Sequence, residues 1–122
     1  MAPRAPLQLL VVEDDPDILE AMSEMLELEG YLVLRARDGH EALKQLESHR
    51  PRLILLDLMM PGMDGLTLAA RLHERSNTIP IVMISADGHL KRALPPGVSR
   101  SLPKPFDIDE LLSTVAASIS PR

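Results

Sequence analysis

The hydrophobic residues of this chain gather in five short runs, separated by longer stretches with a different spacing of apolar positions. The first, third and fourth runs are almost continuous, as expected of strands covered on both faces of a sheet. The second run is shorter and ends at Arg35, which suits a strand at the sheet edge. The pattern predicts strands at Leu7–Val12, Tyr31–Leu34, Leu53–Leu56, Ile79–Ile84 and Val98–Leu102.

The stretches between these runs carry apolar residues three and four positions apart, the spacing of a helix with one buried face. The first such helix has Pro16 in its first turn and Gly30 just beyond its end, positions that these residues favour. The last helix opens with a capping box, in which Asp107 caps the helix and Glu110 reaches back. The residues that mark the helices are Ile18, Met22, Met25, Leu26 and Glu29; Ala42, Leu43 and Leu46; Leu66, Ala69, Ala70 and Leu72; and, as the core stripe of the last helix, Leu111, Leu112, Val115, Ala116 and Ile119.

Strands that alternate with helices over short connections indicate βα units and a parallel sheet. Pro95-Pro96-Gly97 cannot lie within a helix, so the fourth helix, expected at Gly88–Leu94, should be short. We expect an α/β fold of the (βα)5 flavodoxin-like kind, with a five-stranded parallel sheet in the order 2-1-3-4-5 and helices on both faces. The domain should span residues 7–119, between an N-terminal extension (1–6) and a C-terminal tail (120–122).

Composition narrows the class of protein. A chain of 122 residues corresponds to one domain, and the absence of cysteine excludes disulfides and Cys-ligated metals. A net charge of −5, with one Tyr, one Phe and no Trp, argues against a nucleic-acid-binding domain. No apolar run approaches the length of a membrane span, and the first residues are too few and too polar for a signal peptide. We therefore expect a cytoplasmic protein that binds neither membranes nor nucleic acids directly.

Chemically active residues stand where the predicted strands end. Ligands of open α/β sheets bind beyond the carboxyl ends of the strands, so these residues mark the candidate site. In the order 2-1-3-4-5 the first and third strands are neighbours, which would place Asp14, Asp15 and Asp57 within a few ångströms of one another. The residues at the strand ends are Glu13, Asp14 and Asp15 after the first, Asp57 after the third, Ser85 after the fourth and Lys104 after the fifth.

Three carboxylates so close together need compensation. Two carboxylates about 5 Å apart repel by about 3 kcal/mol at an effective dielectric constant of about 20. A cation, a raised pKa or a neighbouring positive charge relieves such repulsion. Oxygen ligands without His or Cys favour Mg²⁺, which retains several waters and binds phosphate-bearing partners. With a lysine and a hydroxyl nearby, the group suits phosphoryl transfer, in which a carboxylate oxygen attacks phosphorus in line.

Each of these residues also has a simpler interpretation. Asp15 is a good N-cap for the first helix, and Asp14 is then an ordinary loop residue. Ser85 alone suits a turn, and Lys104 alone suits an exposed surface. Asp57 is harder to explain in this way, because it ends an apolar strand where the chain has no local need for a charge.

Four motifs contain the residues at the strand ends. They are Val11-Val12-Glu13-Asp14-Asp15-Pro16, Leu55-Leu56-Asp57-Leu58-Met59-Met60-Pro61-Gly62-Met63-Asp64-Gly65, Ile84-Ser85-Ala86 and Pro103-Lys104-Pro105-Phe106. Together they resemble the signature of two-component response-regulator receiver domains. They follow one another in the family's order, and the similarity extends from Leu7 to Ile119. The resemblance implies a chemotaxis-regulator-like fold and a phosphoprotein of a two-component system or phosphorelay.

The resemblance implies a role for each acidic residue of the motifs. Asp57 would accept the phosphoryl group from a sensor histidine kinase or phosphotransfer protein. Asp14 and Asp15 would hold Mg²⁺ together with Asp57 and the backbone carbonyl of Met59. The domain would then act on a downstream protein and would lose its phosphoryl group slowly, without being an enzyme that turns over a substrate.

The other motif residues would assist this transfer. Lys104 would pair with the phosphoryl oxygens, and its bond to Pro105 would be cis. Ser85 would turn its hydroxyl toward the phosphoryl group and report its presence. The adjacent loop would be shaped by Pro61, Gly62 and Gly65.

Two features depart from the family. Ser101 stands three residues before the lysine, where receiver domains usually carry an aromatic that rotates as the hydroxyl moves. The segment from Ser85 to Lys104 is also shorter than usual, and the missing part falls in the expected fourth helix. Both lie on the face of the fourth helix, fifth strand and fifth helix, which family members often use for output or dimerisation. The chemistry is therefore expected to be intact, whereas its transmission is expected to differ.

Two alternatives remain from the sequence. A receiver-shaped interaction module could work without a phosphorylation switch, because Ser101 cannot serve as the switch aromatic. A phosphatase with an aspartyl-phosphate intermediate would also use a strand-end aspartate, a lysine and a hydroxyl. Such enzymes require a second acidic residue two positions after the nucleophile, and Met59 occupies that position.

Overall fold

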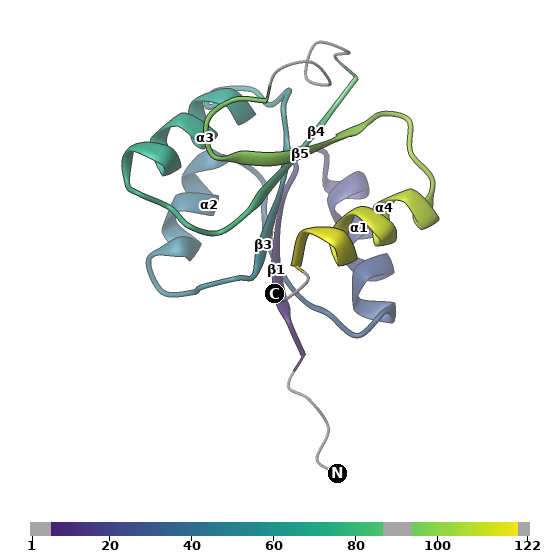
Figure 1. Cartoon of the computed structure of the whole chain (residues 1–122). Coiled ribbons are helices and arrows are strands. Elements are labelled where there is room, and N and C mark those ends of the chain that lie inside the picture. The colour runs from purple at the N-terminus through teal and green to yellow at the C-terminus, as the bar shows by residue number, and fades with distance from the viewer. Residues whose placement is uncertain (1–5, 87–93, 120–122) are drawn as a thin grey trace.

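The strands form one parallel sheet in the order β2-β1-β3-β4-β5, which confirms the predicted topology. The computed structural model describes residues 6–86 and 94–119. The helix predicted at Gly88–Leu94 lies outside the described residues except for Leu94, as do residues 1–5 and 120–122 of the predicted extension and tail. The elements are β1 (Gln8–Val12), α1 (Pro16–Leu28), β2 (Leu32–Ala36), α2 (Gly39–Leu46), β3 (Leu53–Asp57), α3 (Gly65–Glu74), β4 (Ile81–Ser85), β5 (Val98–Pro103) and α4 (Ile108–Ile119) (Figure 1).

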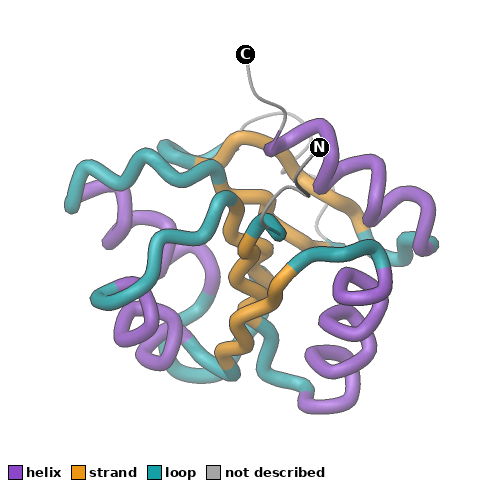
Figure 2. Tube along the Cα trace, turned by 90° about the horizontal axis from the view of Figure 1, so that it is seen from below, coloured by secondary structure: helices purple, strands orange, loops and turns teal. Residues whose placement is uncertain are grey.

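Helices cover both faces of the sheet, as the sequence predicts. α2 and α3 lie on one face, and α1 and α4 lie on the other (Figure 1 and Figure 2). Successive strand residues point to opposite faces, so Leu10 and Val12 of β1 pack in the core beneath α2 and α3. Leu9 and Val11 pack in the second core, beneath α1 and α4. Burial on both sides explains why these runs are continuous in sequence rather than alternating.

The last helix begins as its sequence predicts. The backbone N–H of Asp107 donates to Oε1 of Glu110 at 3.0 Å, and the N–H of Glu110 donates to Oδ1 of Asp107 at 2.8 Å. This reciprocal capping box satisfies two donors that the first turn leaves without helical partners. It fixes where α4 starts, and so sets the length of the loop that follows Lys104.

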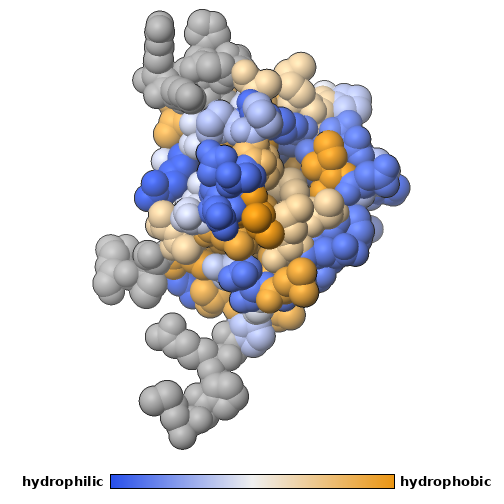
Figure 3. Space-filling view, turned by 90° about the vertical axis from the view of Figure 1, so that its right-hand side faces the viewer, coloured by the Kyte–Doolittle hydropathy of each residue, from blue (hydrophilic) through white to orange (hydrophobic). Residues whose placement is uncertain are grey.

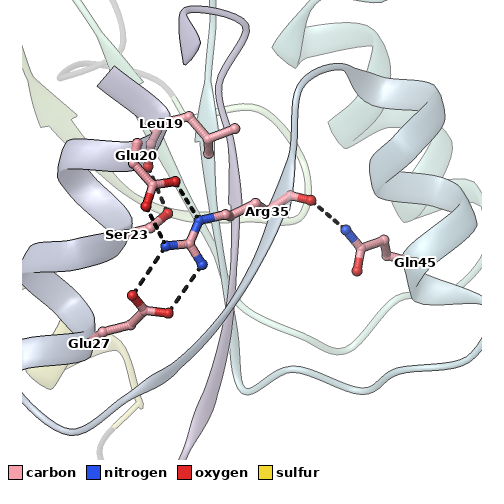
Figure 4. A network of polar contacts seen from close by, with 6 residues as sticks. All are labelled: Leu19, Glu20, Ser23, Glu27, Arg35 and Gln45. Atoms are coloured by element: carbon pink, nitrogen blue, oxygen red, sulfur yellow. Dashed lines mark hydrogen bonds and ion pairs between the residues drawn. The ribbon is translucent and has the colours of Figure 1, made fainter. Parts of the chain in front are cut away.

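The edge strand β2 is tied to the helices on both faces through Arg35 (Figure 4). Its guanidinium forms paired hydrogen bonds with Glu20 and Glu27 of α1, at distances of 3.0 to 3.1 Å. Hydrogen bonding to Arg35 lowers the pKa of the Glu27 carboxyl. On the other face, the Gln45 side chain of α2 donates to the backbone carbonyl of Arg35. One residue thus holds α1 and α2 against the same edge of the sheet.

The outer side of α1 and α4 shows hydrophilic residues with separate apolar areas between them (Figure 3). The large exposed apolar side chains on these two helices are Ile18, Leu28 and Ile108. Within residues 6–86 and 94–119, no helix has both the length and the apolar character to cross a membrane.

The start of α3 packs directly on the end of β3, and this contact requires glycine. The N–H of Gly65 donates to the carbonyl of Leu58 at 2.9 Å. A Cβ atom at Gly65 would lie 2.6 Å from the backbone oxygen of Asp57 and 2.8 Å from the Cα of Leu58. Backbone atoms cannot move aside as the tip of a side chain can. Gly65 therefore sets how closely α3 approaches the strand that carries Asp57.

We expect Gly65→Ala to lower the free energy of unfolding by about 1–3 kcal/mol, because the new methyl group overlaps backbone atoms of β3. Urea unfolding followed by circular dichroism measures this change. Thr67→Ala is the matched control, since Thr67 is exposed on the same helix, and it should change the free energy by less than about 0.5 kcal/mol. Equal effects of the two substitutions would show that the close approach at Gly65 is not a constraint.

Candidate functional site

The carboxyl ends of the strands meet at one edge of the sheet. The register places Val12 beside Leu56, and Asp57 beside Ile84. Asp57 and Ser85 are the last residues of β3 and β4, so the strands run one residue further than the apolar runs predict. The backbone at both residues is therefore held within the sheet and not in a free loop, which fixes where the two side chains start. This rigid placement is what a site with fixed geometry requires.

Asp57 and Lys104, predicted from separate motifs, are in contact. Nζ of Lys104 lies 3.1 Å from Oδ1 of Asp57. The Asp57 side chain is 4% exposed and that of Lys104 is 35% exposed, so the carboxylate is buried while the ammonium reaches it from the rim. The N–H of Lys104 donates to the carbonyl of Ser85 at 3.0 Å, which fixes the lysine relative to β4. The Lys104–Pro105 bond is cis, as predicted.

The acidic group at this edge consists of Glu13, Asp14 and Asp57. One carboxylate oxygen from each of the three lies within 4.8 Å of the others. Glu13 and Asp57 are buried, and Asp14 is half-buried. The set offers only oxygen ligands, close enough together to hold one metal ion.

Asp15, for which the resemblance implies a role as metal ligand, caps α1 in this structure. Its side chain is the N-cap of α1 and accepts hydrogen bonds from the N–H groups of Asp17 at 2.9 Å and Ile18 at 3.2 Å. Glu13 takes its place in the acidic group. The Glu13 backbone N–H donates to the carbonyl of Ala36 and so continues the β1–β2 pairing. The capping signal at Asp15 was visible in the sequence, and it shifts the acidic pair back by one residue.

Burial makes the charges of this group costly. Loss of water raises the pKa of Glu13 to about 7, although the N–H of Asp15 donates to its carboxylate and lowers the value somewhat. The nearby Asp57 charge contributes to this rise in the pKa of Glu13. Burial also raises the pKa of Asp57, against the opposing effect of Lys104. A single ammonium therefore does not fully offset three carboxylates, and the site favours a further cation.

The loop after β3 has the predicted glycine geometry. Gly62 has a φ of +78°, in the left-handed region that side chains disfavour. Gly65 closes the loop against the carbonyl of Asp57. Between them and the strand, the Met59 side chain is 73% exposed, while its backbone hydrogen-bonds Asp57. The role predicted for the Met59 carbonyl as a metal ligand stays a prediction.

Ser85 is buried at the end of β4, on the same edge as Asp57. Ser101 lies further back, on β5, where the register pairs it with Met83. It is half-buried and lines a hollow of about 400 Å³ between β5 and the first turns of α4. Ser101 thus lines open space at the position where the resemblance leads us to expect an aromatic side chain.

Curated proteins and a family model match most of the chain. The model of the response regulator receiver domain matches residues 9–116. The response regulator MprA of Mycolicibacterium vanbaalenii is 37% identical over 115 residues, which cover 92% of this chain and 50% of MprA. MprA of Mycobacterium ulcerans is 37% identical over 114 residues, which cover 91% of this chain and 49% of that protein. The chain thus spans about half the length of the curated relatives that it matches.

Solved receiver structures share the fold. TrrA from Thermotoga maritima, solved in complex with Mg(2+)-BeF, has a TM-score of 0.82 and 34% identity, covering 91% of this chain and 97% of that one. The receiver domain of Francisella response regulator 1452 has a TM-score of 0.86 and 31% identity, covering 93% of this chain and 96% of that one. With the strand-end arrangement of Asp57 and Lys104, these matches lead to one conclusion: the chain belongs to the response regulator receiver domains of two-component signalling systems.

Proposed function

We propose that this domain accepts a phosphoryl group on Asp57 from a phosphohistidine, and that it does so with Mg²⁺ bound beside the acceptor. The observation that carries the proposal is the contact of buried Asp57 with Lys104. One carboxylate oxygen of Glu13 and one of Asp14 lie within 4.8 Å of an oxygen of Asp57. Burial of a carboxylate costs free energy unless it is paired, so a buried Asp57 that shares one ammonium with other acidic groups favours a chemical role. The donor would be a sensor histidine kinase or a phosphotransfer protein, and a downstream protein would read the result.

The proposed transfer is a substitution at phosphorus. A carboxylate oxygen of Asp57 forms the new P–O bond, while the bond between phosphorus and the histidine nitrogen of the donor breaks. The imidazole leaves with the electron pair of that bond. The Lys104 ammonium would neutralise the phosphoryl oxygens, since it already lies 3.1 Å from the acceptor carboxylate. The Ser85 hydroxyl, buried on the same sheet edge, would then bond a phosphoryl oxygen.

The residues present fit a magnesium ion. Glu13, Asp14 and Asp57 supply carboxylate oxygens, the ligand type that Mg²⁺ prefers, and His and Cys ligands do not occur in the group. We assign the ion to these three side chains, with the Met59 carbonyl as a further ligand, and assign Asp15 to capping. The bound ion would supply positive charge that stabilises the transferring group. TrrA, which shares the fold and was solved in complex with Mg(2+)-BeF, supports the choice of magnesium by similarity.

Asp57→Asn should abolish phosphorylation, because an amide oxygen is a far weaker nucleophile than a carboxylate. Incubation of the wild type with acetyl phosphate and Mg²⁺ should add the mass of one phosphoryl group, detected by intact mass spectrometry. Asp64→Asn is the matched control, since asparagine can also cap α3, and it should be labelled like the wild type. Labelling of the Asp57→Asn variant, or none of the wild type, would contradict the proposal.

The assignment of Glu13 rather than Asp15 to the metal site predicts a difference between two conservative variants. Glu13→Gln removes a charge from the acidic group and should weaken Mg²⁺ binding about tenfold or more. Asp15→Asn keeps a capping oxygen and should change the affinity less than about twofold. Because the chain has no Trp, isothermal titration calorimetry is the suitable measurement. A larger loss in Asp15→Asn than in Glu13→Gln would reverse the assignment.

The raised pKa of Glu13 predicts how stability depends on pH without Mg²⁺. Protonated Glu13 is favoured in the folded state, so its contribution is fully present below its usual pKa of 4.5 and is lost as the pH rises through about 7. Glu13→Gln should therefore raise the free energy of unfolding by about 1–3 kcal/mol at about pH 8, with little change at about pH 4. Urea unfolding at both pH values measures this, with exposed Glu29→Gln as control. An equal effect at both pH values would contradict it.

A further inference from the structure

A groove lies between the carboxyl ends of α2 and α3, at the end of the sheet where the strands begin. It encloses about 510 Å³. Because it lies where the strands begin and Asp57 lies where β3 ends, the groove is at the opposite end of the sheet from Asp57. Its floor is aliphatic: Leu43 and Leu46 of α2 and Ile79 before β4 are half-buried and pack against the core. Each of these side chains keeps part of its area in water, so the floor offers apolar surface to a ligand.

The rim of this groove is cationic. It carries His49, Arg50 and Arg75, all exposed. Among the described residues, neither Arg50 nor Arg75 forms an ion pair with a carboxylate, in contrast to Arg35 and Lys104. The two segments that form this end, residues 44–52 and 71–79, contain five Lys and Arg residues against two Glu residues. An acidic chain of net charge −5 thus concentrates unpaired positive charge at one apolar groove.

We propose that this groove binds an acidic segment of a partner protein that carries bulky aliphatic side chains. The aliphatic side chains would lie on Leu43, Leu46 and Ile79, and the flanking carboxylates would face Arg50 and Arg75. Charge complementarity would steer the partner and set its orientation, while the apolar contact would supply most of the affinity. The groove is separate from the residues proposed for phosphorylation, so this surface goes beyond the function proposed above.

The shape of the groove favours a protein segment over other ligands. Six of its eleven lining residues are exposed, so it is too open to bury most of a small molecule, as ligand pockets do. The arginines of the rim could attract a nucleic acid, but the aliphatic floor provides no aromatic side chain on which its bases could stack. Glu47 in the lining would also repel phosphates. An extended or helical segment can cover an open groove and use both its floor and its rim.

The test is a titration of the full chain with a fluorescein-labelled peptide in which glutamates flank two leucines, followed by fluorescence anisotropy. Nuclear magnetic resonance with labelled backbone nitrogen then locates the site, and the largest shifts should fall at Ser76, Asn77 and Ile79. Arg75→Glu should weaken binding about fivefold or more. Arg100→Glu is the matched control, because Arg100 is equally exposed but lies on β5, and it should weaken binding less than about twofold.

Several outcomes would overturn the proposal. No binding at low salt, or shifts centred on the Asp57 edge, would exclude the groove. Equal losses of affinity in Arg75→Glu and Arg100→Glu would show that only the overall charge of the domain attracts the peptide. Unchanged affinity after replacing the leucines of the peptide by serines would remove the role of the aliphatic floor. Tighter binding of an oligonucleotide than of the peptide would point to a nucleic acid instead. Arg50→Glu serves as a second rim variant if Arg75→Glu fails to fold.

Discussion

The crowding of three carboxylates at one sheet edge is the constraint on which the rest of the site depends. Glu13, Asp14 and Asp57 repel one another in a place from which burial has removed much of the water. Lys104 relieves only part of this repulsion, because one ammonium faces three acidic groups. The group around Asp57 therefore favours additional positive charge. In the function proposed above, a magnesium ion would supply this charge, and Lys104 would face the transferred phosphoryl group.

The sheet topology creates this crowding. Only when β1 and β3 are neighbours do the acids that follow β1 meet the acid that ends β3. Gly65 then brings α3 against the carbonyl of Asp57, which leaves the loop after β3 little freedom to move Asp57 away. Strand pairing on one side and the close-packed start of α3 on the other hold Asp57 near the other two carboxylates. The fold thus works against its own stability at this edge, as functional sites commonly do.

The sequence predicted what depends on pattern, whereas the set of metal ligands depends on local geometry at single residues and stays a prediction. Continuous apolar runs indicated strands buried on both faces, and the strand ends in the predicted topology included both Asp57 and Lys104, which are in contact. The choice between Glu13 and Asp15 could not be made by counting acids, because three stand in a row. It depends on which one caps α1, because a side chain that accepts hydrogen bonds from the first turn of a helix is less able to bind a metal. The position of Asp15 directly before Pro16 indicates this cap in the sequence, and the structure confirms the cap.

The missing aromatic and the charge distribution bear on how such a domain would signal. Ser101 leaves a hollow beside α4 instead of a side chain that could report on Ser85. A binding surface whose shape depends on the rotation of such a side chain therefore cannot change in that way here. The cationic groove at the other end of the sheet has its own apolar floor and unpaired arginines, and needs no such rotation to bind. A domain with acids at one end and cations at the other can engage two partners of opposite charge at once, because neither partner has to cross the surface that the other occupies.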